Sequence, residues 1–332
     1  MTDNPMGLTV AVTGPTGDIG TAAVAALEQD ANVDRIVGMA RRPFDPSSQG
    51  WTKTTYRQGD ILDRDAVESL VADADVVVHL AFVIMGSRDG SERVNLDGTR
   101  NVFEACAAGA PDGRPRRLVY SSSVAAYGYH SDNPVPITED VPPRGSPEHY
   151  YSEQKAACEA VLTEVSAESP LEVFILRPCI VAGPHAHMLV DALPWNRIPY
   201  LKATRVLEII KPLVPDPGVP VQLVHHDDVA TAIAVAATGS APPGAYNIAG
   251  DGVVSVSDVA AALGGRPVRV PAVAATAASA VIARLPIVPS AAEWLHAART
   301  SVVMDTTKAK TQLGWTPGYT SAQTLAALAA SL

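Results

Sequence analysis

The sequence has few cysteines, and their spacing excludes two kinds of stabilising chemistry. Its 332 residues include only 3 cysteines, and Cys106, Cys158 and Cys179 show none of the CxxC spacing of metal knuckles or redox pairs. A sparse, odd-numbered set is typical of a reducing compartment and provides no disulfide framework. We therefore expect neither a structural metal site nor a disulfide-stabilised fold.

Long apolar runs and basic runs are also missing. No stretch reaches the ~18 apolar residues of a membrane span, and the nearest, residues 270–283, ends at Arg284 and Pro286. The N-terminus carries Asp3 and Pro5 and has no apolar signal region. The net charge is −10, which argues against nucleic acid or an anionic membrane surface as a partner. These absences predict a soluble, cytoplasmic protein.

Apolar residues are abundant, at 47% of the chain against 18% charged, and they fall in a regular pattern. The length fits one large α/β domain with an insert. Short apolar runs alternate with helical stretches; the runs are 8–12, 35–40, 54–58, 75–80, 117–121 and 172–176, and the stretches are 21–28, 64–71, 92–108 and 150–166. Asp63 can cap the helix at 64–71. This alternation predicts a doubly wound parallel sheet of the Rossmann type.

The regular pattern ends near residue 182. Seven prolines lie within 183–222, which predicts an insert of loops and short helices. Late strands are expected at 221–224 and 245–248, returning to the sheet or its edge, and helices at 257–263, 290–299 and 320–330. We therefore expect a dinucleotide-binding domain over 8–182, to which elements of 221–250 return. A smaller substrate-binding domain would comprise 183–220 and 251–332.

The first strand leads into a glycine-rich turn and then an Ala-rich helix. Gly14, Gly17 and Gly20 would respectively permit a tight turn, close approach of a pyrophosphate, and close packing of helix on strand. The start of the helix would add exposed N–H groups and a positive dipole end. The alternative is an ordinary Gly-rich turn without a ligand.

Two further patterns could carry chemistry. Tyr151 and Lys155 are four residues apart, so they share one helix face, and the ammonium would lower the pKa of the tyrosine. Tyr151 would then be a general acid or base, although a surface Tyr–Lys pair gives the same pattern. Ser123 ends a run of three serines after a predicted strand, where ligands of open α/β sheets bind. A serine cluster that merely caps a turn is the alternative.

In this order and spacing, the motifs resemble those of the extended short-chain dehydrogenase/reductase superfamily, of the NAD-dependent epimerase/dehydratase-like type. The matching segments are TGxxGxxG at 13–20, GDI at 59–61, HLA at 79–81, NxxGTxN at 95–101, SSxxxYG within 120–128, YxxxK at 151–155, RPxxxxGP at 177–184, HDDVA at 226–230, YNI at 246–248 and LGWTP at 313–317. The resemblance covers residues 8–328.

The resemblance implies hydride transfer with a nicotinamide cofactor. Tyr151 would exchange the proton of a carbonyl or alcohol, Lys155 would hold the nicotinamide ribose, and Ser123 would orient the substrate oxygen. The cofactor is expected to contact Gly14, Thr16, Gly17, Asp18, Ile19, Arg41, Asp60, Ile61, Leu80, Ala81, Phe82, Ser121, Tyr151, Lys155, Pro178, Ile180 and Val181.

The residues after the second strand favour NADP(H), with NAD(H) as the alternative. An acidic residue at this place binds the ribose 2′-hydroxyl in NAD-preferring folds, but the sequence has Arg41 and Arg42 here and no carboxylate before Asp45. Arg41 could bind a 2′-phosphate in a bidentate manner. Asp18 complicates this interpretation, because a carboxylate that pointed inward from the glycine turn would repel the additional phosphate.

The substrate is expected to be a small molecule, and an apolar one. Val124 follows Ser123 in place of the acidic pair of dehydratases, and 221–224 lacks the charge expected near a diphosphate. The expected substrate contacts are Ile84, Met85, Ser123, Val124, Tyr151, His187 and Trp195. We therefore predict oxidation or reduction of a carbonyl or alcohol. The alternatives are a nucleotide-sugar epimerase with tightly bound NAD and a non-catalytic dinucleotide-binding sensor.

Two other features lead to expectations of their own. Residues 225–228 read His-His-Asp-Asp, but neighbouring side chains of a strand point to opposite faces, so we expect a structural role and no metal. The superfamily often pairs the helices that correspond to 92–108 and 150–166, which implies a homodimer.

Overall fold

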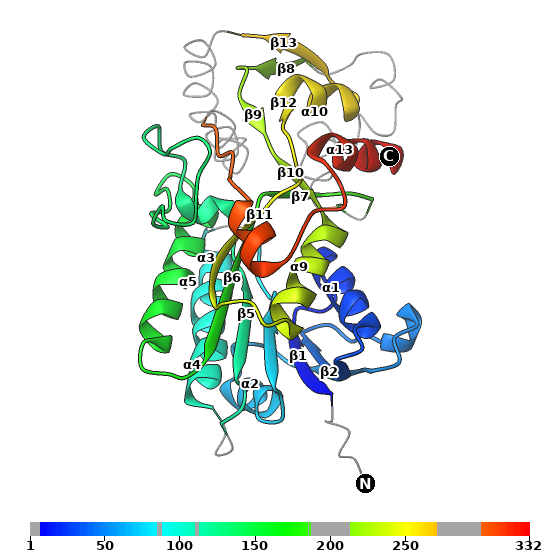
Figure 1. Cartoon of the computed structure of the whole chain (residues 1–332), viewed down its shortest axis with the longest axis vertical. Helices are drawn as coiled ribbons and strands as arrows, with labels where there is room; N and C mark the ends of the chain where they lie inside the picture. The colour runs from blue at the N-terminus through cyan, green and yellow to red at the C-terminus, as the bar shows by residue number, and fades with distance from the viewer. Residues whose placement is uncertain (1–6, 85–87, 110–112, 185, 187–212, 271–299) are drawn as a thin grey trace.

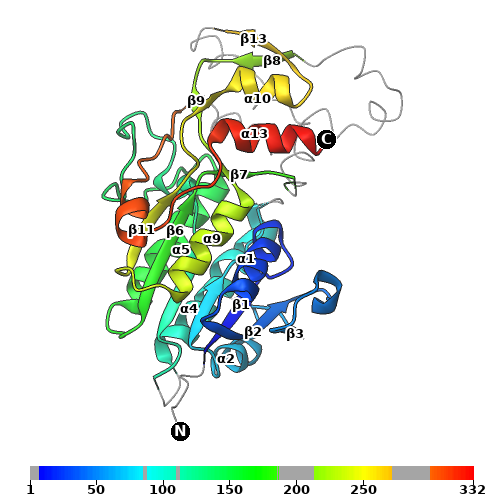
Figure 2. The same ribbon diagram turned by 45° about the vertical axis from the view of Figure 1, so that its right-hand side comes forward.

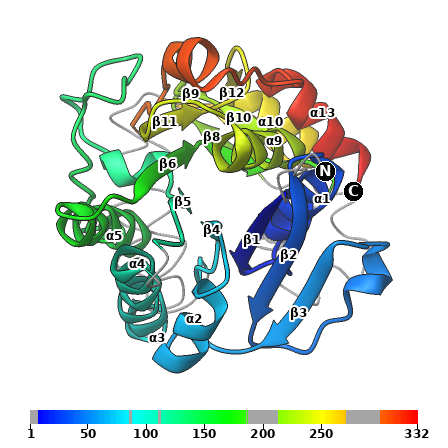
Figure 3. The same cartoon turned by 60° about the horizontal axis from the view of Figure 1, so that its bottom comes forward.

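A computed structural model describes residues 7–84, 88–109, 113–184, 186, 213–270 and 300–332. Its centre is a seven-stranded parallel sheet in the order β11-β6-β5-β4-β1-β2-β3 (Figures 1 and 3). The strands are β1 (Leu8–Thr13), β2 (Val33–Ala40), β3 (Thr54–Gln58), β4 (Val76–His79), β5 (Arg117–Ser121), β6 (Glu172–Pro178) and β11 (Gly244–Ile248). The predicted Rossmann-type α/β class is confirmed.

Helices cover both faces of the sheet (Figure 3). Helices α1 (Asp18–Gln29) and α9 (His226–Thr238) cover one face, and α2 (Arg64–Val71), α4 (Thr99–Ala108) and α5 (Tyr150–Ser166) cover the other. Strand side chains alternate between the two layers. Val10 and Val12 pack with the α1 layer, whereas Ala11 packs with the α2 layer. This alternation divides the apolar residues into two core layers.

The layer of α1 and α9 joins segments far apart in the chain (Figure 2). Val24 of α1 and Ile233 of α9 belong to the same buried cluster. At the edge of this contact, Thr238 donates its hydroxyl to Asp30 over 2.8 Å, across 208 residues of sequence. The early helix is thus covered by a late one.

Local signals placed several elements correctly, including α2, whose N-cap Asp63 accepts from the Ala66 amide. The segment 92–108 is helical as expected, but it is not one regular α-helix. The structure has α3 (Arg88–Glu92), a π-helical stretch over Arg93–Gly98 and then α4. At this wide turn the Asn95 side chain bonds both the N–H and the C=O of Val83, and single π turns are frequent at functional sites.

The late strands divide between separate small sheets. β7 (Ile180–Ala182) pairs with β10 (Leu223–His225), β9 (Pro220–Val221) with β12 (Val254–Ser255), and β8 (Leu213–Asp216) with β13 (Arg266–Arg269). The expected strand 221–224 is therefore split between two small sheets, and of the two late strands only 245–248 joins the central sheet. We expected β6 to end at Leu176. Its pairing with β11 continues to Pro178.

A smaller layer lies beyond the carboxyl edge of the sheet (Figures 1 and 2). It contains β8, β9, β12, β13, α10 (Val256–Ala262) and α13 (Ser321–Ala330). The π turn Ala309–Leu313 precedes α13. The predicted helix 290–299 lies outside the described residues. No helix in the described part of the chain has the length and hydropathy to cross a membrane.

Candidate active site

The three glycines of the first turn have different reasons to be glycine. Gly14 has φ 73°, and a Cβ there would lie 2.9 Å from the Ala81 amide nitrogen. A Cβ on Gly20 would lie 2.0 Å from the Gly14 carbonyl oxygen, so helix and strand could not pack. A Cβ on Gly17 would meet nothing nearer than 3.8 Å. The fold thus requires Gly14 and Gly20, whereas Gly17 is free to serve a ligand that approaches the backbone.

This difference predicts opposite phenotypes for two alanine variants. Gly20→Ala should destabilise the fold by about 1–3 kcal/mol or more, because backbone must move. Gly17→Ala should cost less than about 1 kcal/mol and yet weaken dinucleotide binding at least about tenfold. Thermal unfolding and cofactor titration measure both effects. Equal cofactor affinity of Gly17→Ala and the wild-type chain would contradict this interpretation of the turn.

The parallel register brings the other expected cofactor contacts to the same edge. Thr13 is level with both Met39 and His79, and His79 with Tyr120. The residues that follow these positions therefore gather at the carboxyl ends of the strands. They are Thr16, Asp18 and Ile19 at the start of α1, Arg41 after β2, Asp60 and Ile61 after β3, Leu80, Ala81 and Phe82 after β4, Ser121 at the end of β5, Pro178 at the end of β6, and Ile180 and Val181 in β7.

Tyr151, Lys155 and Ser123 come together at this edge. Lys155 is buried in α5 and donates from Nζ to the Ser121 carbonyl over 2.8 Å, with Nζ 3.7 Å from the centre of the Phe82 ring. Tyr151 shares a side-chain hydrogen bond with Ser123. The Phe82 and Tyr151 rings meet edge to face at 5.6 Å. The predicted catalytic set is therefore spatially contiguous with the loop that follows β4.

The pKa values differ from the sequence-based expectation. Burial raises the pKa of Tyr151 to about 12, against the lowering effect of its hydrogen bond with Ser123. Burial lowers the pKa of Lys155 to about 8. The predicted lowering of the tyrosine pKa is wrong, because Nζ faces the Ser121 carbonyl and lies 6.0 Å from the Tyr151 ring centre. Tyr151 is therefore protonated at neutral pH and equipped to donate a proton.

The loop after β4 is fixed by contacts that sequence reasoning did not foresee. Asn95 bonds the Val83 amide over 2.7 Å and the Val83 carbonyl over 2.9 Å. Gln154, one residue before Lys155, accepts a further bond from Asn95 over 2.8 Å. Tyr150 donates to the Ile84 carbonyl over 2.9 Å. These bonds hold Phe82 against Lys155 and Tyr151.

A buried polar network lies behind the serines and was also missed. Ser122 donates to Glu159, which forms a bidentate pair with Arg177 at 3.0 and 2.6 Å. Arg177 donates to the Tyr127 hydroxyl over 2.8 Å, and Tyr127 donates to Asn247 over 2.7 Å. The network joins β5, α5, β6 and β11. The available sequence signal was the position of Glu159, one helical turn after Lys155.

Of the remaining expected substrate contacts, the structure describes two and does not describe the other three. Ile84 lies in the fixed loop, and Val124 is buried in a 3₁₀ turn over Val124–Tyr127 whose N-cap is Ser123. Met85, His187 and Trp195 lie outside the described residues. Three of the seven expected substrate contacts thus fall outside the part of the chain that the structure describes.

The His225–Asp227 cluster does not follow the strand rule we applied to it. The strand ends at His225 and α9 begins at His226, so both rings lie on one side, 4.2 Å apart. With Asp227 they could offer metal ligands within 4.8 Å of one another. His225 Nδ1 also accepts from the Asp227 amide as the N-cap of α9, which gives this ring a structural role.

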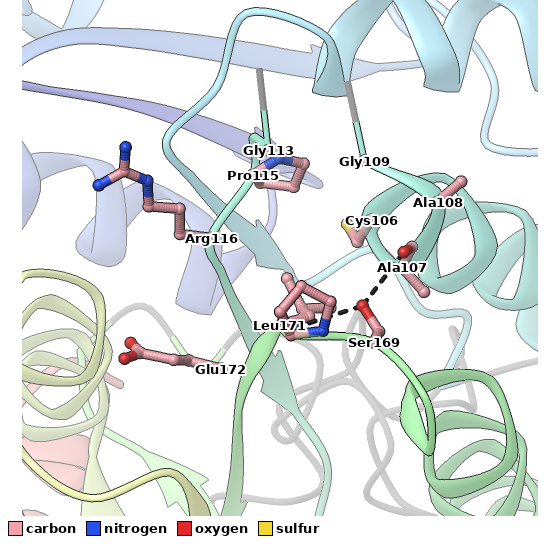
Figure 4. Close-up of a pocket in the computed structure, with 11 residues that line it drawn as sticks. Cys106, Ala107, Ala108, Gly109, Gly113, Pro115, Arg116, Ser169, Leu171 and Glu172 are labelled. Carbon is pink, nitrogen blue, oxygen red and sulfur yellow. Dashed lines mark hydrogen bonds between the residues drawn. The ribbon is translucent and has the colours of Figure 1, made fainter. Parts of the chain in front are cut away.

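A surface pocket lies at the opposite, amino edge of the sheet (Figure 4). It is lined by the end of α4 and by the segments that lead into β5 and β6, including Arg116 and Ser169. Ser169 donates to the Ala107 carbonyl over 3.1 Å, which ties two of its walls together. The pocket contains none of the predicted site residues and is separate from the candidate active site.

With the fold and the catalytic edge defined, comparison with known proteins identifies the class. Residues 10–249 match the family model described as the NAD dependent epimerase/dehydratase family. The chain belongs to this family.

Three individual relatives each share less than a third of their residues with this chain in the matched regions. The uncharacterized protein y4nG of Sinorhizobium fredii is 28% identical over 95% of this chain and 76% of its own length. Cinnamoyl-CoA reductase 2 of Medicago truncatula is 24% identical over 58% of this chain and 60% of its own. The structure of MoeE5 in complex with UDP-glucuronic acid and NAD superposes with a TM-score of 0.70 at 22% identity, covering 97% and 98% of the two chains. The last likeness shows the fold.

Proposed function

We propose that this protein transfers a hydride between NADP(H) and a carbonyl or alcohol of a small apolar molecule. Ser123, Tyr151 and Lys155 are the proposed catalytic residues. The observation that carries the proposal is the geometry of Tyr151, which is hydrogen-bonded to Ser123 and lies one helical turn from the buried Lys155 at the carboxyl edge of the sheet. The glycine turn, open at Gly17, fits the pyrophosphate of such a cofactor.

In this mechanism the nicotinamide supplies or accepts the hydride when bound, and the protein handles the proton. Ser123 orients the substrate oxygen by a hydrogen bond. In the direction of reduction Tyr151 donates its proton to that oxygen and regains a proton from solvent before the next turnover. In the direction of oxidation Tyr151 must first lose its proton to solvent, and its phenolate then accepts the proton of the alcohol. Lys155 is proposed to hold the nicotinamide ribose hydroxyls.

The test is a turnover assay of the purified protein with NADPH and NADH against a panel of aldehydes, ketones and alcohols. We expect cofactor oxidation or reduction with an apolar member of the panel. The similarity to cinnamoyl-CoA reductase 2 makes aromatic acyl and aldehyde compounds a first choice for the panel. Bound cofactor without turnover of any member would instead favour the non-catalytic sensor.

A nucleotide-sugar epimerase is the second candidate. It is favoured by the structural likeness to MoeE5 in complex with UDP-glucuronic acid and NAD. An epimerase returns its hydride to the same substrate, so the purified protein would retain NAD that does not exchange. Mass spectrometry of the denatured protein, followed by assays with UDP-sugars, separates the two candidates.

The preference for NADP(H) rests on Arg41, which is exposed at the end of β2. Arg41→Ala should weaken NADPH binding about tenfold, since it removes a charge-assisted contact to the 2′-phosphate, and should leave NADH binding unchanged. Arg116→Ala, an exposed arginine at the opposite edge of the sheet, is the matched control. An unchanged NADPH affinity in Arg41→Ala would refute the assignment.

The proposal also covers the domain organisation, the oligomeric state and the location of the protein. Residues 183–220 and 251–332 would form the substrate-binding domain, and the homodimer would pair the 92–108 and 150–166 segments of two copies. Light scattering of the purified protein measures the oligomeric state. A cytoplasmic location would be tested by cell fractionation.

A further inference from the structure

The turn after β2 is held through four consecutive backbone carbonyls. Met39 accepts from the Gly14 amide over 3.0 Å, and Ala40 accepts from the Gly59 amide over 3.0 Å. Tyr56 of β3 places its hydroxyl 2.8 Å from the Ala40 carbonyl and also against that of Arg42. The carbonyl of Arg41 accepts from the Gln58 side chain over 3.0 Å. One side of this turn is therefore tied to the glycine turn and the other to the edge strand β3.

The Tyr56 ring is itself fixed. Tyr56 is level with Gly38 in the parallel register, so the ring lies beside a position that has no side chain. Phe44 packs on it at 5.6 Å between ring centres, and Trp51 packs on Phe44 at 5.5 Å. Burial raises the pKa of the Tyr56 hydroxyl, which keeps its proton available to the two carbonyls that share it.

The charges around this turn favour an anionic ligand. The side chains of Arg41 and Arg42 are exposed, and within the described residues neither guanidinium donates a hydrogen bond or joins an ion pair. The nearest carboxylate along the chain, Asp45, accepts from the backbone and the hydroxyl of Ser47 as the cap of the 3₁₀ turn Pro46–Gln49. It is thus occupied within its own loop, where it neutralises neither arginine through a contact.

We propose that Tyr56 is a specificity-determining positioning residue, which holds the Arg41–Arg42 turn beside the glycine turn so that the arginines meet the 2′-phosphate of NADP(H). This inference rests on the proposed cofactor preference and adds the residue that enforces it. Gln58 assists by holding the middle carbonyl. The arginines supply the charge, and the edge strand supplies the geometry.

The test compares NADPH and NADH affinities of the full-length protein by titration of tryptophan fluorescence. Tyr56→Phe keeps the ring and its packing and removes the two hydrogen bonds. We expect NADPH binding to weaken about five- to tenfold, with NADH binding unchanged. Tyr246→Phe is the matched control. Tyr246 lies on β11, the opposite edge strand, and this variant removes its hydroxyl, which donates to the Pro242 carbonyl.

A variant without the two arginines shows whether Tyr56 acts by positioning them or by stabilising the fold in general. In a chain that already carries Arg41→Ala and Arg42→Ala, Tyr56→Phe should cause no further loss of NADPH affinity, because the groups it positions are gone. A further loss there, or an equal loss for NADH, would mean that Tyr56 acts through the fold as a whole and would overturn the proposal.

The titrations distinguish a failure of the proposed cofactor preference from a failure of the proposed role of Tyr56. Equal affinity of the wild-type chain for NADPH and NADH would overturn the cofactor preference, and the role of Tyr56 with it. A wild-type preference for NADPH that Tyr56→Phe retains in full would overturn the role of Tyr56 alone. Thermal unfolding of each variant accompanies the titrations, and Gln58→Met, expected to give a smaller change of the same sign, provides an independent variant.

Discussion

Replacement of Tyr151 by phenylalanine should reduce turnover by about 10²–10⁴-fold while the fold is preserved. General acid–base catalysis contributes an effect of this size, and the variant removes the hydroxyl that shares a hydrogen bond with Ser123. Because the pKa of Tyr151 is raised to about 12, the proton-donating form persists across the accessible pH range. Single-turnover oxidation of NADPH with an active substrate measures the loss.

The adjacent tyrosine provides the control. Tyr150→Phe removes a hydroxyl that donates to the Ile84 carbonyl, so it relaxes the loop after β4 without touching the reacting proton. We expect less than about a tenfold loss, the scale of one hydrogen bond. If Tyr151→Phe kept more than a tenth of the wild-type rate, or lost no more than Tyr150→Phe, Tyr151 would not be the proton donor.

The largest expected effect on stability concerns the buried ion pair behind the site. Glu159 and Arg177 have side chains only 3% and 5% exposed and are joined by two hydrogen bonds. Glu159→Ala would leave the guanidinium buried without its carboxylate and should lower the free energy of unfolding by about 3–5 kcal/mol. Urea denaturation followed by circular dichroism gives this value.

A surface pair of the same geometry is available for comparison. Asp132 and Arg144 also form two bonds, each 2.9 Å, but in contact with solvent. Asp132→Ala should leave the unfolding midpoint nearly unchanged, since water replaces the lost partner. Similar midpoints for Glu159→Ala and Asp132→Ala would show that the buried pair contributes no more than the exposed one.

The central sheet was predictable because its determinants are local. Strands such as β5 appear in the sequence as short apolar runs, and α2 is fixed by its cap Asp63. The π-helical stretch Arg93–Gly98 was not predictable, because the apolar pattern of the sequence does not distinguish a π turn from an α turn. The division of 221–224 between two small sheets likewise depends on partners elsewhere in the chain.

In the candidate site, too, the features that depend on local sequence were predictable and those that depend on tertiary contacts were not. The roles of Gly14 and Gly20 follow from backbone sterics, and the proximity of Tyr151 and Lys155 from helix periodicity. The pKa of Tyr151 was predicted in the wrong direction, because sequence spacing specifies a neighbour but not the degree of burial. The contacts of Tyr56 and Arg177 were likewise hidden, since each involves elements that only the folded sheet brings together.

The coverage of α1 by α9 has a consequence for biosynthesis. The apolar side of α1, which includes Val24 and Leu27, is buried against a helix whose last contact lies 208 residues later. At translation rates of about 5–20 residues per second, the ribosome needs on the order of 10–40 s to produce that partner. During this interval the nascent chain carries an uncovered apolar helix face, the kind of surface that chaperones bind and that exposes a slowly translated chain to aggregation.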